Sequence, residues 1–182
     1  MTSFDASFSY GEYEGVLRKL IHLFKYDRIA PLASALAPML SRALPREAVF
    51  DVIAPMPLHW FRQWRRGFNQ SELLAHVLAR RTGIPVVRAL RRKRSTPPQA
   101  GLTRAERRLN VAGAFEVRKR ETVEGKHVLL IDDVMTTGAT ASACAAALKR
   151  AGARRVSVLT LARVDRRNGF AGLGGAVASV SA

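Results

Sequence analysis

The feature that most constrains the fold of this chain is an apolar run that leads into two acids and a hydroxyl-rich turn. Four apolar residues at 128–131 precede this group. Its members are Asp132, Asp133, Thr136, Thr137, Gly138 and Thr140. A continuous apolar run is typical of a strand buried in a parallel sheet. The Ala-rich stretch at 139–151 predicts a helix that ends at Gly152. The sequence therefore predicts a strand–turn–helix unit whose turn carries polar side chains.

Apolar spacing predicts three further helices. The first covers about 12–25, and the second begins at Pro31 and continues towards Leu44. We expect Pro38 to kink or interrupt the second helix, because proline removes a backbone donor. The third covers 70–81, with Gly83 just beyond its end.

Shorter apolar runs predict strands between the helices, at 49–54, 84–90, 112–117, 126–131 and 156–162. Alternation of strands and helices predicts an α/β fold with a mainly parallel sheet flanked by helices. We divide the chain into an N-terminal helical region at 1–45, a core at 46–165 and a flexible C-terminal tail at 166–182.

The charge balance favours a polyanionic partner. The chain has 30 Lys and Arg against 14 Asp and Glu, a net charge of +16. The candidate nucleic-acid contacts are Arg88, Arg91, Arg92, Lys93 and Arg94. A basic surface that is simply solvated is the alternative. The single cysteine, Cys144, excludes an internal disulfide and any multi-cysteine zinc site, and we expect it to be packed. No signal peptide or membrane-spanning stretch is apparent, so we expect no membrane insertion and a cytoplasmic location.

The turn after the apolar run has the chemistry of a phosphate site. Free amides at a helix start bind anions, hydroxyls add donors, and Gly138 allows close approach of the backbone. Carboxylates beside the phosphate suit the vicinal hydroxyls of a sugar or a Mg²⁺ ion. These features predict a ribose 5-phosphate site. The alternative is an acidic helix cap followed by an ordinary turn. The candidate residues are Asp132, Asp133, Val134, Met135, Thr136, Thr137, Gly138, Ala139 and Thr140.

Two other segments contribute candidates. A proline-rich strand end and the following helix start offer a second anion site suited to pyrophosphate, formed by Pro57, Arg66, Asn69 and Gln70. An ordinary basic loop with an Asn cap is the alternative. The segment 91–110 is polar and basic, and we interpret it as a long loop. It is either a lid that carries Arg104 and Arg107 to a leaving group or a solvated segment.

The segment 128–140 closely resembles the signature by which phosphoribosyltransferases bind phosphoribosyl pyrophosphate (PRPP). Other stretches make the chain similar to the ComF family (the ComFC/GntX-like phosphoribosyltransferases). They are Tyr13-x-Gly15, Leu20-Ile21 with Lys25-Tyr26 and Arg28, Pro55-x-Pro57-Leu58, Arg66 to Gln70, and Gln99 to Asn110. Many ComF-like proteins begin with a four-cysteine zinc module, which this sequence lacks.

The resemblance implies a type I phosphoribosyltransferase fold with a small N-terminal hood. It also implies that Asp132 and Asp133 hold the ribose hydroxyls, directly or through Mg²⁺ that accompanies PRPP, and that 134–140 binds the 5-phosphate. Arg66, Asn69 and Gln70 would approach the pyrophosphate, and the loop would bring Arg104 and Arg107. The implied activity is phosphoribosyl transfer to an unidentified acceptor. The alternative is a competence factor that associates with single-stranded DNA or the uptake machinery, with or without turnover.

Overall fold

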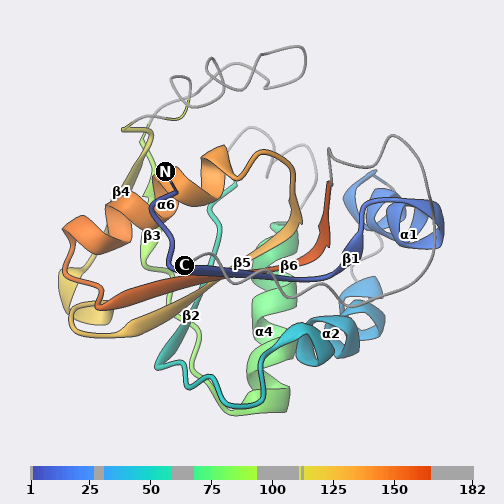
Figure 1. Ribbon diagram of the computed structural model, residues 1–182, viewed down its shortest axis with the longest axis horizontal. Helices are drawn as coiled ribbons and strands as arrows, with labels where there is room; N and C mark the ends of the chain where they lie inside the picture. The colour runs from blue at the N-terminus through green and yellow to red at the C-terminus, as the bar shows by residue number, and fades with distance from the viewer. Residues whose placement is uncertain (1, 27–30, 59–67, 94–110, 112, 165–182) are drawn as a thin grey trace.

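The computed structural model describes residues 2–26, 31–58, 68–93, 111 and 113–164. Their centre is a four-stranded sheet (Figure 1). Its strands are β1 (Ala6–Glu12), β6 (Arg155–Arg163), β5 (His127–Met135) and β2 (Val52–Pro55), in that order across the sheet. All three neighbouring pairs are parallel, which confirms the predicted type of sheet.

Strand β5 is longer than the sequence predicted. The apolar run was expected to end the strand at 131, yet pairing with β6 continues through Asp132↔Thr160 to Met135↔Arg163. The two acids therefore lie within the strand, and successive side chains of a strand point to opposite faces of the sheet. This alternation separates Asp132 from Asp133.

Strand β1 was not predicted. It pairs with β6 from Ala6↔Ser157 to Glu12↔Arg163 and forms one edge of the sheet. Phe8 is its one buried side chain, although Ala6, Phe8 and Tyr10 alternate with Ser7 and Ser9, a period of two that could have indicated a strand. The region 1–45, expected to be a helical hood, thus also supplies a strand to the central sheet.

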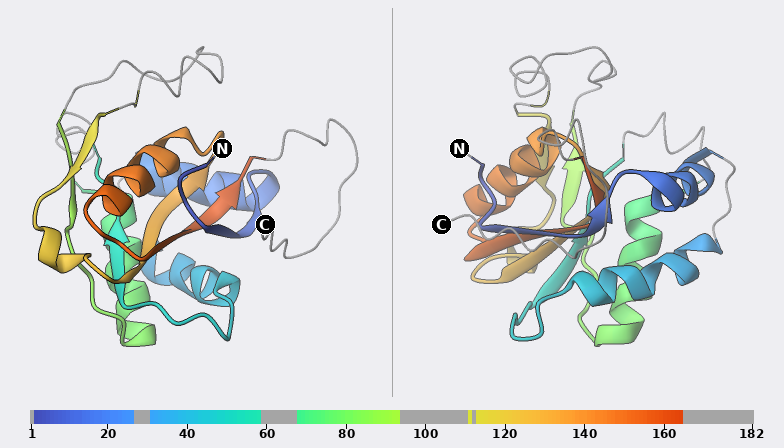
Figure 2. Two further views of the ribbon diagram at one scale, coloured as in Figure 1. Left: turned by 60° about the vertical axis from the view of Figure 1, so that its left-hand side comes forward. Right: turned by 45° about the vertical axis from the view of Figure 1, so that its right-hand side comes forward.

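Three helices cover one face of the sheet, α1 (Gly15–Tyr26), α2 (Leu32–Ala43) and α4 (Gln70–Thr82) (Figures 1 and 2). All three agree with the predicted helices, and α2 runs through Pro38 without interruption. Their buried side chains pack against alternate residues of β5 and β6. The larger members of this cluster are Ile21, Phe24, Leu36, Leu40, Leu74, Leu78, Leu129, Ile131, Leu159 and Leu161.

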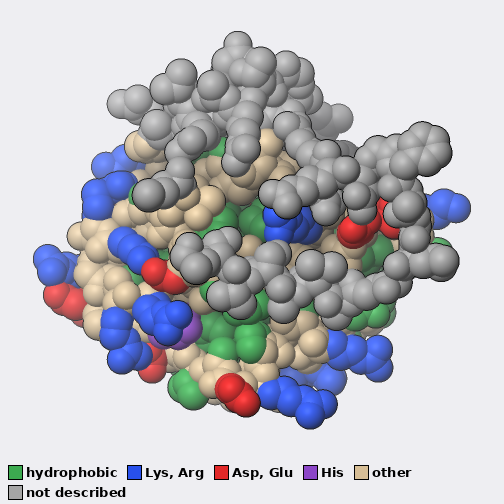
Figure 3. Space-filling view, in the orientation of Figure 1, with side chains coloured by type: hydrophobic (Ala, Val, Ile, Leu, Met, Phe, Trp, Pro, Cys, Tyr) green, Lys and Arg blue, Asp and Glu red, His purple; other side chains and the backbone are tan. Residues whose placement is uncertain are grey.

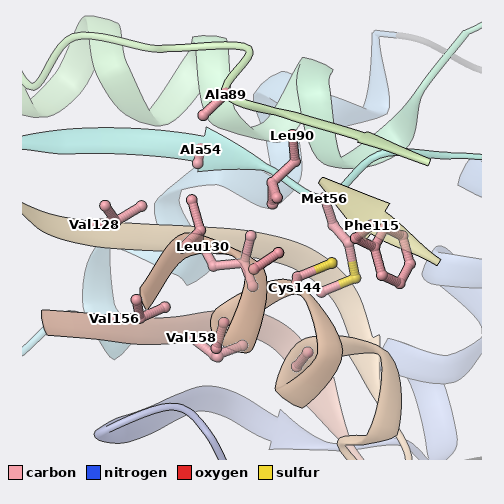
Figure 4. Packing of buried hydrophobic residues seen from close by; sticks show 14 of the residues in the cluster. Ala54, Met56, Ala89, Leu90, Phe115, Val128, Leu130, Cys144, Val156 and Val158 are labelled. Atoms are coloured by element: carbon pink, nitrogen blue, oxygen red, sulfur yellow. The ribbon is translucent and has the colours of Figure 1, made fainter. Parts of the chain in front are cut away.

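The other face is covered by helix α6 (Ala139–Arg150) and a small antiparallel pair, β3 (Leu90–Arg92) and β4 (Phe115–Val117) (Figure 2). Figure 4 shows Leu130, Met56 and Phe115 packed around Cys144, which is fully buried as expected. The predicted strand at 84–90 is largely wrong. Only Val86 forms a bridge there, to Ile53, and the strand proper is displaced to 90–92, where it pairs with β4.

Within the described part of the chain, no helix combines the length and the apolar character needed to cross a bilayer.

Candidate phosphoribosyl pyrophosphate site

A pocket opens at the carboxyl edge of the sheet, where β5 passes into the start of α6. Its lining residues are Met56, Asp132, Val134, Met135, Thr136, Thr137, Gly138, Ala139, Thr140, Ala141, Val158 and Thr160. This set contains every predicted residue of 132–140 except Asp133. In open α/β sheets this edge is where ligands bind.

The turn at 136–138 presents the start of α6 to this pocket. Gly138 has φ 71°, in the left-handed region that glycine enters without strain, and it is the N-cap of α6. Gly138 offers no side chain to cap the helix. The nearest substitute is the Thr137 hydroxyl, which accepts from the amide of Ala139 at 3.4 Å. That is a long hydrogen bond, so an anion can compete for the first amides of the helix.

Asp132 lies on the pocket side of β5. Its Oδ1 accepts from the Ser71 hydroxyl at 3.0 Å and from the backbone amide of Asp133 at 2.9 Å. Burial, followed by the neighbouring charge of Asp133, raises the pKa of Asp132 to about 7. Lys25 and the two hydrogen bonds oppose that rise. Asp132 is thus an acceptor held in place by the start of α4.

Asp133 lies on the opposite face of β5, where it meets Lys25. The ammonium of Lys25 is 3.0 Å from Asp133 Oδ1, and the two side chains are only 18% and 10% exposed. Burial of Lys25 opposes its charge, but the nearby carboxylates of Asp133 and Asp132 outweigh this effect and raise its pKa. Helix α1 is therefore tied to the acid pair by a largely buried ion pair.

The segment after β2 borders the same site. The amide of Met56 donates to Ile131 of β5 at 2.9 Å, which places 56–58, with Pro57, beside the end of β5. Both polar atoms of the Asn69 side chain have hydrogen-bond partners within the protein. Its Oδ1 accepts from the amide of Ser71 and caps α4, while its Nδ2 donates to the carbonyl of Met56 at 3.1 Å. Gln70 is 2% exposed at the first turn of α4.

Three predicted site residues, Arg66, Arg104 and Arg107, lie outside the described residues. The sequence interpretation also missed two residues. Lys25 is four positions after the fully buried Ile21, so its place on the inner face of α1 could have been noticed. Ser71 gave no such signal, because a serine in the first turn of a helix is common and its contact with Asp132 spans 61 positions.

The predicted nucleic-acid cluster is partly neutralised. Arg88 forms an ion pair with Glu72, and Arg91 and Lys93 both pair with Glu116. The guanidinium of Arg92 lies over the ring of Phe115, at 5.4 Å from its centroid. The fifth member, Arg94, lies outside the described residues.

Known proteins place the chain in a family. A sequence model of the phosphoribosyl transferase domain matches residues 69–170, which begin at the cap of α4 and include the pocket. The fold and the site thus define a protein of the type I phosphoribosyltransferase class.

Similar proteins show to which family within this class the chain belongs. DNA utilization protein YhgH of Escherichia coli K12 is 38% identical over 159 residues, which cover 84% of this chain and 69% of the relative. Competence protein F of Haemophilus influenzae is 35% identical over 170 residues, covering 88% and 74%. Competence protein ComFC of Bacillus subtilis is 33% identical over 156 residues, covering 83% and 61%. The chain belongs to the ComF family, as the sequence motifs indicated.

Among solved structures, the glutamine PRPP amidotransferase of B. subtilis is 26% identical over 72% of this chain and 26% of its own, with a TM-score of 0.49.

Proposed function

We propose that the chain binds PRPP at the carboxyl edge of the sheet and transfers its phosphoribosyl group to an acceptor. The observation that carries this proposal is the pocket in which Asp132 stands beside the start of α6. The pocket offers hydrogen-bond acceptors on one side and amide and hydroxyl donors on the other. A sugar that carries a terminal phosphate has the complementary arrangement.

In this proposal the 5-phosphate lies at 134–140, against the amides that begin α6 and the hydroxyls of Thr136, Thr137 and Thr140. Asp132 accepts from the ribose hydroxyls. Asp133 lies on the opposite face of β5, outside the pocket lining, and its charge is balanced by Lys25. Since Asp132 loses its proton at about pH 7, binding of the diol is coupled to proton release.

Mg²⁺ is the cofactor that we propose accompanies PRPP. Within the described residues, no three His, Cys, Asp or Glu side chains converge as a metal site, so the pocket offers the carboxylate of Asp132 and not a complete coordination shell. Mg²⁺ commonly binds through one or two carboxylates together with waters and substrate phosphates. Asp132, the acid of the pair that lines the pocket, therefore fits a metal held jointly with the substrate, where it would neutralise the pyrophosphate charge. Asp133 lies on the other face of β5, beside Lys25.

The remaining candidate residues are proposed to contact the pyrophosphate leaving group. Pro57, Gln70 and Arg66 are proposed to border the pyrophosphate, with Arg104 and Arg107 arriving from the segment 94–110. Asn69 supports this region by joining α4 to Met56. Transfer would depend on positioning and on stabilisation of the departing charge, without a nucleophilic side chain.

Calorimetry with Mg²⁺–PRPP tests the binding step. We expect Asp132→Asn to weaken binding about 10- to 100-fold, since a hydrogen bond to a charged group is worth about 1.5–3 kcal/mol. Glu121→Gln is the matched control, because Glu121 is an exposed acid on the turn before β5. Equal affinity in Asp132→Asn and the control would remove the assigned site. Pyrophosphate release with a panel of nucleobases then tests for turnover.

A role in DNA handling is the second candidate. It is favoured by the net charge of +16 and by relatives named for DNA utilization and competence. The ion pairs of Arg88, Arg91 and Lys93 reduce the free charge of the cluster proposed to contact the strand. Single-stranded DNA binding should weaken steeply with salt, and the triple Ala variant of these residues should lower the slope of that dependence. Binding that does not change with salt would exclude this role.

A further inference from the structure

We propose that the opposite, amino-terminal edge of the sheet carries a second ligand site, which takes a nucleoside monophosphate unit. This site is independent of the proposed PRPP site. Strands β1, β5 and β6 are parallel and begin at this edge, so the two sites lie at opposite ends of β5. Along β5, Asp132 of the PRPP site lies five residues beyond His127 of this pocket, about 17 Å at ~3.3 Å per residue.

The first observation is an open pocket of about 430 Å³. That volume lies within the roughly 300–1,000 Å³ typical of small-molecule pockets. The starts of the three strands and the loop before β2 form it. Its lining residues are Ala6, Phe8, Glu47, Ala48, Val49, Phe50, His127, Arg154, Arg155 and Ser157.

The second observation is an apolar and aromatic lining that suits a planar ring. The rings of Phe50 and His127 contact each other, with centroids 4.6 Å apart. Phe8 adds a third ring. Val49 is 78% exposed, one of three large apolar side chains that the described surface leaves open. Rings and alkyl groups of this kind give a nucleobase a surface on which to stack.

The third observation is a pair of arginine side chains at the rim of the pocket. Arg154 lies 3.7 Å from Asp51, and both are exposed. Arg155 is exposed and forms no ion pair with a described residue, although its charge helps lower the pKa of Asp5. Glu47 is the one acid among the lining residues. Two guanidinium groups at the rim match a phosphate, which accepts paired N–H donors.

The charges of the two arginines also act on the buried polar groups of the pocket. His127 Nε2 is 2.9 Å from the Ser157 hydroxyl, and the two residues are 8% and 2% exposed. Burial lowers the pKa of His127, and the charges of Arg155 and Arg154 lower it further. The hydrogen bond to Val49 and the charge of Asp51 oppose this shift. An anion at this edge would therefore lie near these two guanidinium groups and beside an imidazole that Ser157 holds in place.

Two neighbouring turns border this edge of the sheet. Hydrogen bonds from Gly125 to Gly152 and from Arg154 to Lys126, at 2.8 and 2.9 Å, join the turns that precede β5 and β6. Figure 3 shows Lys and Arg side chains, with Asp and Glu side chains among them, over the side of the molecule where Figure 1 draws these turns. Charge complementarity thus favours an anionic occupant, such as a phosphate, over a neutral or basic one.

The test uses AMP and a short deoxyadenosine oligonucleotide as probes of the full chain. We expect Arg155→Ser to weaken binding of one or both probes about 10-fold or more, through loss of a charge-assisted contact. Val49→Asp should have a similar effect through repulsion. Both residues are exposed, so the variants should fold. Arg118→Ser, an exposed cation outside the pocket, is the matched control.

The outcomes separate the ligand sources and the two sites. Loss of AMP binding in Arg155→Ser would identify a free nucleotide as ligand, whereas loss of oligonucleotide binding alone would identify a nucleic-acid strand. AMP that enters the PRPP pocket would bind Arg155→Ser normally and Asp132→Asn poorly. Equal binding to Arg155→Ser and Arg118→Ser, or no binding of either probe, would overturn the proposal. Mg²⁺–PRPP affinity should be the same in Arg155→Ser and the parent, whichever result is obtained.

Discussion

At the scale of single residues, the acid pair behaves as two different groups. Asp132 lies in the pocket and accepts from Ser71, while Asp133 is 7% exposed and meets Lys25. Adjacent positions of a strand point to opposite faces, so the peptide backbone itself imposes the difference. Lys25 joins them electrostatically, because its charge acts on both carboxylates.

Asp132 should make stability depend on pH. Its pKa rises from 3.8 to about 7 on folding, so the folded state keeps a proton that the unfolded chain has already lost. This contribution to stability is complete below about pH 4 and is lost as the pH rises to about 7. Urea unfolding from pH 4 to 8 should show the parent losing stability relative to Asp132→Asn. A difference between the two that stays constant across this range would contradict the assignment.

Removing one partner of the ion pair of Lys25 and Asp133 should lower the stability of the fold. Lys25→Met keeps the aliphatic stem but leaves a largely buried carboxylate without its partner, and we expect a loss of about 3 kcal/mol at pH 7.5. The double variant Lys25→Met, Asp133→Asn should recover part of this loss, since no charge is then left unpaired. Urea unfolding measures both. Equal stability of the two variants would show that the pair contributes little coupling.

At the scale of elements, two helix starts converge on the carboxyl edge and are built differently. Helix α4 is capped by the side chain of Asn69, which also holds the segment after β2. Helix α6 begins at Gly138 with no side-chain cap from that residue. The capped start therefore serves as a support, and the uncapped start retains amides for a ligand.

Removing the cap of α4 should act on both stability and binding. Asn69→Ala deletes the bond to Ser71 and the bond to Met56, so we expect a loss of about 1–2 kcal/mol in the free energy of unfolding. PRPP affinity should fall as well, because Ser71 positions Asp132. Asn69→Asp, which keeps the capping oxygen, is the matched control for the cap alone. Unchanged unfolding in Asn69→Ala would show that the cap is dispensable.

At the scale of the whole molecule, one parallel sheet separates two chemically distinct edges. The carboxyl edge carries the acids and the turn of α6, and the amino edge carries Arg154, Arg155 and an aromatic lining. Parallel strands place all their carboxyl ends together and all their amino ends together. A polyanion at the amino edge could therefore be bound without displacing PRPP.

Ligand binding should stabilise the entire domain. A ligand that binds the folded state alone adds about 2.7 kcal/mol at 100 times its Kd. Mg²⁺–PRPP should raise the unfolding temperature of the parent and of Arg155→Ser equally, and of Asp132→Asn much less at the same concentration. Thermal unfolding followed by circular dichroism measures this shift. An identical shift in the parent and Asp132→Asn would argue against binding at the carboxyl edge.

Local sequence was sufficient to predict the helices and strands that have a strong apolar pattern. The helices at 12–25, 31–44 and 70–81 and the buried strand of 126–131 carry strong apolar patterns, and the structure has helices and a strand there. Local sequence did not predict the strands whose position depends on pairing with a distant strand. The strand expected at 84–90 gave way to β3, whose residues pair with β4, and β1 forms because β6 offers it an edge.

By itself, the sequence determined the parallel α/β class and pointed to the segment 132–140, all of which except Asp133 lines the pocket, because these follow from runs of neighbouring residues. Met56, Ala141, Val158 and Thr160 join the lining only through the fold. Tertiary structure alone decided that Asp133 faces Lys25, that Ser71 holds Asp132 and that Glu72 and Glu116 neutralise the basic cluster. These contacts join positions that are from 16 to 108 residues apart, so their geometry is set by the packing of helices on the sheet and by no local pattern.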